Sequence, residues 1–205
     1  MSARPGWLPH VGRLHGVTAP DPAQQLPIWT TKPQQPRGPE RPRWWWIGVA
    51  GGVGTSSLAE ASRGVGGDAG HAWPDPAFGP PYGVVLVARS TVRGLDAASL
   101  AARQHAAGRV PAGTQLLGLV VVADAPGKLP RRLTDHLEVI GGAVPNLWRF
   151  GWCEPWRHRP RTEPLDEPPE LRGLLAAIGR VAEITAPPFA QVPPAPRREL
   201  APEHH

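Results

Sequence analysis

The 205-residue sequence has a single cysteine, Cys153, which excludes a disulfide-stapled scaffold. No apolar run approaches the ~18 residues that cross a membrane, and no apolar segment of the signal-peptide kind lies near the N-terminus. The glycines have no period of three, which excludes a collagen helix. We therefore expect a cytoplasmic protein without a membrane span.

Complete catalytic motifs are missing as well. The eight histidines are scattered and have no metal-ligand spacing, and no Ser-His-Asp arrangement or carboxylate pair is present. Cys153 has no neighbouring histidine or aspartate in the sequence that would make it a nucleophile. The sequence thus predicts a fold and a binding site more clearly than a reaction.

Proline and glycine are abundant, at 28 and 24 residues, whereas the hydrophobic 40% clusters in the middle of the chain. Residues 1–43 contain nine prolines, and residues 186–205 contain six. Such segments bury too little apolar surface to offset their ordering entropy. We predict disordered tails over 1–43 and 186–205, one domain over 44–185, and a loose linker within it at 159–169.

The net charge of +5 is concentrated in the first tail. Residues 1–43 carry six basic and two acidic groups, whereas residues 44–185 carry fourteen basic and thirteen acidic groups. A basic arm would give weak, salt-sensitive contact with nucleic acid. A merely solvated tail explains the same pattern.

Apolar runs alternate with helical segments between the tails. The sequence predicts strands at 44–50, 83–88, 116–123 and 146–150, helices at 56–62, 95–107, 130–140 and 171–184, and a long loop at 64–83. This alternation predicts βαβ units and therefore an α/β fold, a three-layer sandwich with a mostly parallel sheet.

A glycine-rich turn joins the first predicted strand to the first predicted helix. Its sequence from position 49 is Val-Ala-Gly-Gly-Val-Gly-Thr-Ser-Ser. Glycines let consecutive backbone N–H groups turn inward around a phosphate, and a hydroxyl at the start of the helix reaches Mg²⁺. A turn of this kind also occurs with no ligand, and the sequence leaves that alternative open.

The turn resembles the deviant Walker A loop of the ParA/MinD-like partitioning ATPases, lysine-glycine-glycine-valine-glycine-lysine-threonine-threonine. The resemblance implies a P-loop NTPase-like fold that binds ATP and Mg²⁺ through Gly51, Gly52, Val53, Gly54, Thr55, Ser56 and Ser57, with Ser56 at the metal. Two departures matter: Ala50 and Thr55 stand where that family has lysines. Without those charges, we expect ATP affinity to be weak or lost, and hydrolysis to be inefficient.

The resemblance covers residues 44–155 and is generic outside the turn. Residues 85–98 resemble the strand and helix after the Walker B region, and residues 117–124 resemble the next strand. We expect a nucleotide-binding or pseudo-ATPase module that acts in regulation, DNA partitioning or mobile-element maintenance, within a small actinobacterial family of degenerate proteins. The alternatives are an active ATPase in which Lys128 replaces the missing lysine, and a nucleic-acid-binding accessory protein.

Asp124 follows the strongest predicted strand, in the sequence Asp-Ala-Pro-Gly. Such a turn resembles a Walker B or GTPase-type metal-binding turn, which would place Asp124 at a Mg²⁺ water opposite Ser56. An aspartate that caps the turn backbone explains the sequence equally well. Both interpretations place Asp124 at the carboxyl end of a strand, where α/β folds bind ligands.

Trp148, Trp152 and Trp156 follow one another at intervals of four. Glycine and proline between them argue against a helix, so we predict a strand end that continues into an aromatic loop. Such a loop binds a protein partner, stacks on a base or covers the core. We also expect Trp44 to Trp46 to be partly exposed. The partners left open are a nucleotide, a protein at this loop, nucleic acid at the N-terminal tail and a second copy of the chain.

Overall fold

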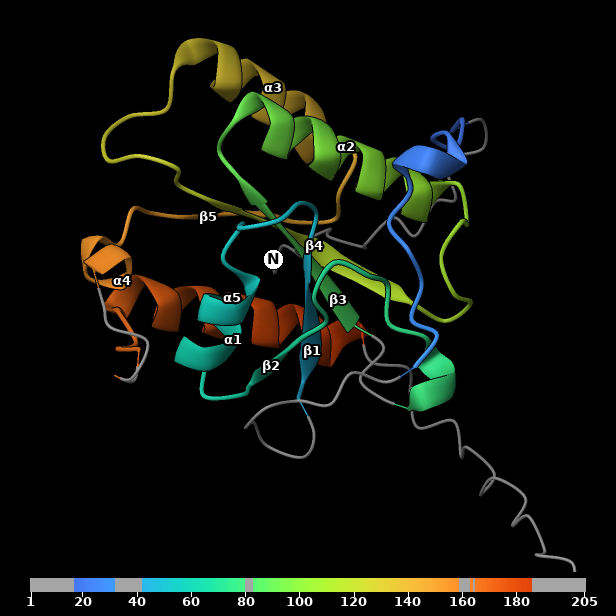
Figure 1. Ribbon diagram of the computed structural model, residues 1–205, viewed down its shortest axis with the longest axis horizontal. Helices are drawn as coiled ribbons and strands as arrows, with labels where there is room; N and C mark the ends of the chain where they lie inside the picture. Colours follow the sequence, from blue (N-terminus) through green and yellow to red (C-terminus); the bar gives the residue numbers. More distant parts are fainter. Residues whose placement is uncertain (1–16, 32–41, 80–82, 159–162, 164, 186–205) are drawn as a thin grey trace, which may run out of the picture.

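Five parallel strands form one sheet in the computed structural model, which describes residues 17–31, 42–79, 83–158, 163 and 165–185 (Figure 1). The strand order is β2-β1-β3-β4-β5, and every pair is parallel. The strands are β1 (Trp44–Gly48), β2 (Gly66–Asp68), β3 (Gly83–Arg89), β4 (Gln115–Val122) and β5 (Leu147–Phe150). The predicted α/β class with a parallel sheet is confirmed.

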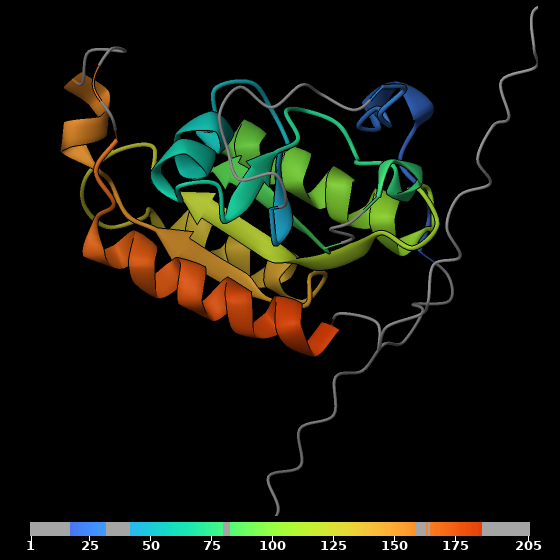
Figure 2. The same cartoon turned by 90° about the horizontal axis from the view of Figure 1, so that it is seen from below.

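Helices cover both faces of this sheet. They are α1 (Thr55–Ala61), α2 (Val92–Ala106), α3 (Arg131–Gly141), α4 (Glu154–His158) and α5 (Pro169–Thr185). Leu95 of α2 and Leu137 of α3 belong to the core on one face, and Leu58 of α1 and Leu174 of α5 to the core on the other. Figure 2 shows α5 running along β4 and β5. The predicted strands and helices agree with these bounds to within three residues.

Three consecutive tryptophans in β1 are fully enclosed, with exposed fractions of 0%, 2% and 0% for Trp44, Trp45 and Trp46. Successive side chains of a strand point to opposite faces. Trp44 and Trp46 therefore pack beside α1 and α5, while Trp45 packs on the face of α2 and α3. The expectation of partial exposure is wrong because helices or loops cover β1 on both sides.

Strand β2 lies within the segment predicted as a loop, so that prediction is wrong there. Gly66 of β2 lies directly beside the indoles of Trp44 and Trp46. A Cβ atom on Gly66 would lie 2.2 Å from Nε1 of Trp46 and 2.7 Å from Nε1 of Trp44. The strand needs glycine because two large side chains of β1 occupy that space.

Residues 17–31, the N-terminal strap, pack against the domain on the face of α2 and α3. Gln104 accepts a hydrogen bond from the Leu26 N–H and donates one to the Leu26 carbonyl, each 2.9 Å long. Trp29 contacts Trp45 edge to face at 5.0 Å, and Ile28 forms a parallel bridge with Trp73. The predicted disordered tail is therefore wrong for residues 17–31. Residues 1–16, 32–41 and 186–205 lie outside the described residues.

The aromatic segment after β5 forms a short helix, α4, where the sequence predicts a loop. Pro155 is the second residue of α4, and proline is tolerated in the first turn because those N–H groups have no intrahelical acceptor. In the predicted linker, Leu165 is buried in the core beside α1 and α5. Residues 159–162 and 164 of that linker lie outside the described residues.

Candidate functional site

The glycine turn, residues 50–54, leaves β1 and ends at α1. Gly52 and Gly54 have φ angles of +70° and +100°, a conformation that glycine adopts without steric cost. A Cβ atom placed on Gly51, Gly52 or Gly54 would have no other atom within 4 Å. The three glycines therefore border open space, whereas the Val53 side chain is packed in the core.

The sheet topology places this turn at a recognised ligand position. Strand β1 pairs with β2 on one side and with β3 on the other, and α1 and α2 cover opposite faces. The order 2-1-3-4-5 is a common doubly wound order, in which ligands bind beyond the carboxyl ends of β1 and β3. The loops that follow β1 and β3 meet at that crevice.

A pocket of about 540 Å³ occupies this crevice. That volume is typical of small-molecule sites. Its lining comes from the glycine turn, from the β3–α2 connection and the first half of α2, from the residues after β4 and from α4: Ala50, Gly51, Gly52, Val53, Arg89, Thr91, Arg93, Gly94, Ala97, Asp124 and Arg157. The structure thus brings Gly51, Gly52, Val53 and Asp124, all expected from the sequence, to one pocket. The Val53 side chain is buried in the core, so only its backbone is available to a ligand.

Ser56 faces Asp68, at the end of β2. The Ser56 hydroxyl donates a hydrogen bond of 2.7 Å to Oδ2 of Asp68, and the Gly70 N–H donates one of 2.8 Å to Oδ1. The carboxylate at the Ser56 hydroxyl is therefore that of Asp68, whereas one interpretation of the sequence placed Asp124 opposite Ser56. Asp68 was not expected at this position, because it lies in a Gly-rich segment predicted as a loop.

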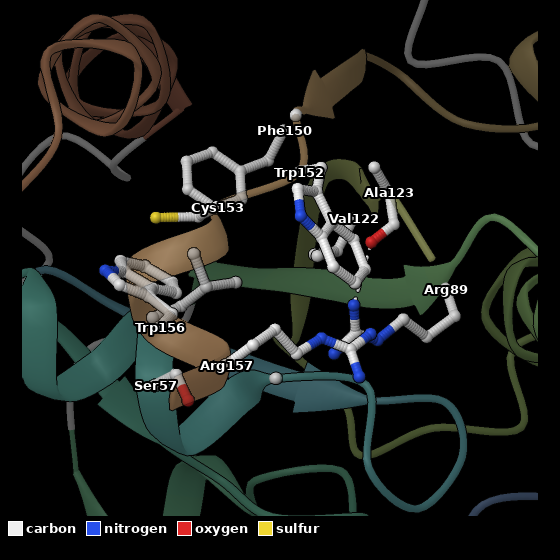
Figure 3. Close-up of a pocket in the computed structure, with 12 residues that line it drawn as sticks. Ser57, Arg89, Val122, Ala123, Phe150, Trp152, Cys153, Trp156 and Arg157 are labelled. Carbon is white, nitrogen blue, oxygen red and sulfur yellow. Dashed lines mark hydrogen bonds between the residues drawn. The ribbon is translucent and has the colours of Figure 1, made fainter. Parts of the chain in front are cut away.

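Gly54 and Ser57 line a second, smaller cavity of about 70 Å³ (Figure 3). Phe150, Trp152 and Trp156 line it too, so part of its wall is aromatic. Thr55 belongs to neither cavity: its Oγ1 lies 3.2 Å from the position that a Cβ on Gly48 would occupy. The predicted turn residues are therefore distributed between two adjoining cavities, the end of β1 (Thr55) and the end of β2 (Ser56).

Two arginines lie between these cavities and line both of them, Arg89 from the end of β3 and Arg157 from α4. Arg89 donates hydrogen bonds to the carbonyls of Gly52 (3.3 Å) and Ala123 (2.8 Å). Burial and then the positive charge of Arg157 lower the pKa of the Arg89 guanidinium, while Asp124 raises it. Neither arginine was singled out in the sequence, although Arg89 directly follows an apolar strand that ends at the crevice.

Asp124 presents an exposed carboxylate to the larger pocket. Its backbone N–H donates to Oγ of Ser90 at 2.9 Å, and its backbone carbonyl accepts from Arg157 at 3.3 Å. Among the described residues, the Asp124 carboxylate makes no hydrogen bond, so the turn-capping bond expected from the sequence is not observed.

The three spaced tryptophans do not form one surface. Trp152 and Trp156 line the small cavity, whereas Trp148 packs from β5 against the core beside α5. The Arg157 guanidinium lies over the Trp152 ring, 4.4 Å from its centroid. Burial raises the pKa of the Cys153 thiol, which keeps it protonated and makes it a poor nucleophile.

Other chemistries find less support in the part of the chain that the structure describes. That part contains no group of three or more His, Cys, Asp or Glu side chains placed to hold a metal ion. None of its helices has the length and apolar character needed to cross a membrane. Lys128 is exposed and lines neither cavity.

Comparison with known protein families matches residues 43–171 to a family described as "Family of unknown function (DUF6668)". No curated protein and no solved structure matches the chain. The matched segment runs from the residue before β1 into the start of α5, and so includes the glycine turn and Arg89, Arg93 and Arg157. Because it covers more than half of the 205 residues, the chain belongs to the DUF6668 family.

Proposed function

We propose that this protein is a ParA/MinD-like module that binds the phosphates of a nucleotide at the glycine turn and does not hydrolyse them efficiently. The observation that supports the proposal best is the open turn at the switch point of the sheet. Gly51 and Gly52 line a pocket of about 540 Å³, and no other atom lies within 4 Å of where their Cβ atoms would be. Backbone N–H groups there are free to approach an anion closely.

The absence of a lysine from this pocket argues for binding without turnover. Phosphoryl transfer in P-loop proteins uses a lysine of the turn that contacts the β- and γ-phosphates directly. Position 55 is threonine, and Lys128 is not among the residues that line either cavity. The runner-up, an ATPase that uses Lys128, would require the loop before α3 to move toward the turn.

In this proposal, two oxygen donors beside the turn, Ser56 and Asp68, would hold a magnesium ion, although neither residue lines a cavity. The Ser56 hydroxyl and the Asp68 carboxylate lie in direct contact at 2.7 Å, and both are the hard oxygen donors that Mg²⁺ prefers. Bound with a nucleotide, Mg²⁺ would neutralise phosphate charge. The same proposal includes a P-loop NTPase-like fold, a cytoplasmic location and a role in DNA partitioning or mobile-element maintenance. These parts rest on the resemblance of the turn sequence to the ParA/MinD-like loop.

A fluorescent ATP analogue tests the proposal directly, with and without Mg²⁺. Gly51→Val is the decisive variant, because the residue has no positive φ and its Cβ would enter open space in the pocket. We expect weak binding by the native protein, at least a tenfold loss in Gly51→Val, and no steady-state phosphate release above background.

The matched control is Gly173→Ala, since Gly173 in α5 also has no atom within 4 Å of a Cβ position. This variant should bind like the native protein. Absence of any binding by the native protein, or equal binding by Gly51→Val, would reject the proposal. Turnover that disappears in Lys128→Ala would support the runner-up.

A further inference from the structure

Three arginines from separate elements converge on the pocket at the glycine turn. Arg89 ends β3, Arg93 lies in the first turn of α2, and Arg157 lies in α4. The only carboxylate in the lining is Asp124, so the lining carries a formal charge of +2. The domain as a whole is nearly neutral, with fourteen basic and thirteen acidic groups over residues 44–185. The positive charge is therefore a local property of the pocket.

Arg89 is positioned by the protein and still has donors to spare. Its two hydrogen bonds to the carbonyls of Gly52 and Ala123 fix the guanidinium between the turn and the end of β4. Those bonds use two of its five N–H donors, and its remaining donors have no acceptor among the described residues. A planar guanidinium with free donors suits an oxyanion.

Arg157 is held close to Arg89, and no carboxylate among the described residues forms a hydrogen bond or ion pair with either arginine. The charge of Glu154, also in α4, does interact with that of Arg157. Figure 3 shows the two side chains pointing toward one another from opposite sides of the cavity, with Trp152 beside them. The Trp152 ring and the Asp124 carbonyl hold Arg157 in place. The repulsion between the two guanidinium groups contributes to the lowered pKa of Arg89. An anion between them would remove this repulsion.

We propose that Arg89, Arg93 and Arg157 bind the phosphate chain of a ligand with two or more linked phosphates, and so replace the charge of the lysines missing from the turn. This inference rests on the proposed function, which places phosphates at the turn. A chain of two or three phosphates carries at least the charge needed to neutralise a lining of +2. It can also contact Arg93, which lines only the larger pocket, together with Arg89 and Arg157, which line both cavities. The same chemistry is found in a nucleoside triphosphate and in inorganic polyphosphate.

Calorimetric titration of inorganic tripolyphosphate, ATP and orthophosphate into the full chain, at constant ionic strength, tests the inference. We expect tripolyphosphate to bind more tightly than orthophosphate. Arg93→Gln and Arg157→Gln should each weaken tripolyphosphate binding by roughly ten- to a hundredfold, the range of a charge-assisted hydrogen bond. The affinity of Arg157→Lys for tripolyphosphate should lie between those of the native protein and Arg157→Gln, because lysine keeps the charge but lacks the planar guanidinium.

Arg180→Gln is the matched control. Arg180 is exposed on α5, next to Gly179, which lies beside Arg43 just before β1. It is therefore at the amino end of the sheet, opposite the pocket, and its replacement should leave binding unchanged. Thermal unfolding of each variant without ligand separates lost binding from lost folding, and Arg157 is exposed enough that its variants should unfold like the native protein.

The outcomes separate this inference from the proposed function. If ATP binds and Gly51→Val blocks it, but the arginine variants bind normally, the arginine site is rejected and the proposed function stands. A second outcome is that the arginine variants no longer bind tripolyphosphate, that ATP binds no more tightly than tripolyphosphate, and that Gly51→Val does not weaken ATP binding. In that case the arginine site stands and the nucleotide proposal is rejected. If tripolyphosphate does not bind to the native chain, the arginine site is rejected outright.

Discussion

Two glycine segments beside β1 have opposite surroundings. At the glycine turn after β1, no atom lies within 4 Å of a Cβ position on Gly51, Gly52 or Gly54. At Gly66, in the neighbouring strand β2, the indole Nε1 of Trp46 would lie 2.2 Å from a Cβ atom. Glycine therefore keeps space free for a ligand in the first segment, whereas it makes room for tryptophan packing in the second.

The tryptophan region, Trp29, Trp44, Trp45, Trp46 and Trp73, is buried almost completely. Within the described chain, the indole N–H groups of Trp44, Trp46 and Trp73 have no hydrogen-bond acceptor. Leaving a buried donor unpaired costs free energy, and the apolar contact area of the indoles offsets it. The pocket at the glycine turn differs, because its unpaired guanidinium donors line an open pocket where a ligand can accept their hydrogen bonds. Substitutions in each region should thus affect different properties.

Gly66→Ala should have the largest effect. The added methyl group would overlap two indoles that are fully enclosed by the protein. Overpacking of this kind should lower the free energy of unfolding by about 3 kcal/mol. Urea denaturation measures this value, with Gly173→Ala as the control, which should be neutral or stabilising by up to about 1 kcal/mol. Equal stabilities of Gly66→Ala and the native protein would show that β2 does not pack as described.

Thr55→Lys should strengthen nucleotide binding and leave the tryptophan region unchanged. A lysine at position 55 would give the turn the charge that the ParA/MinD-like loop has. A charge-assisted contact to phosphate contributes roughly 1.5–3 kcal/mol, so the dissociation constant for ATP should fall about ten- to a hundredfold. Titration of the fluorescent ATP analogue measures the change. Undetectable binding by a well-folded Thr55→Lys protein would mean that the turn is purely structural.

Gly52→Ala should cost less stability than Gly66→Ala, for a different reason. Its Cβ would meet no atom within 4 Å, but the φ of +70° is unfavourable for alanine. We expect a loss of about 1 kcal/mol in urea denaturation, from backbone strain alone. A loss as large as that of Gly66→Ala would contradict the open geometry of the turn.

The smallest effect concerns pH. His105 of α2 stacks on Trp73 at 6.1 Å, and burial lowers its pKa below the ordinary value, while a backbone hydrogen bond with Thr114 acts in the opposite direction. Since the folded state binds this proton less readily than the unfolded state, stability should fall as pH decreases from about 6.5 toward the lower folded pKa. His105→Gln should flatten this part of the stability curve, measured by thermal unfolding. Parallel curves for both proteins would exclude His105 as the cause.

The sequence predicts best those elements whose signal is local. The apolar runs that became β3 and β4 are enclosed on both faces, and their composition alone identifies them as buried parallel strands. Strand β2 was missed because Gly-Gly-Asp has low β-propensity and forms a strand only through pairing with β1. The strap was missed because its few apolar residues depend on Trp73 and Gln104, far along the chain.

The same limit applies to the candidate site. The glycines of the turn were identified because a strand, a turn and a helix follow one another in sequence. Arg89 and Arg157 are 68 positions apart and meet only through the order of the strands. Asp68 reaches Ser56 because β2 pairs with β1 in parallel. Contacts of this kind need the sheet topology, which one sequence does not specify.

The N-terminal strap also has a consequence for the order of events on the ribosome. Leu26 emerges early, but its hydrogen-bond partner Gln104 follows 78 residues later, and the partner of Trp29, Trp73, also comes afterwards. The strap must therefore wait until β3 and α2 have been synthesised, and contacts of long sequence separation form slowly. Pulse-labelled hydrogen exchange during refolding should show the amides of Leu26 and Trp29 protected after those of β3 and β4. Protection of the strap amides first would show that it docks on something else.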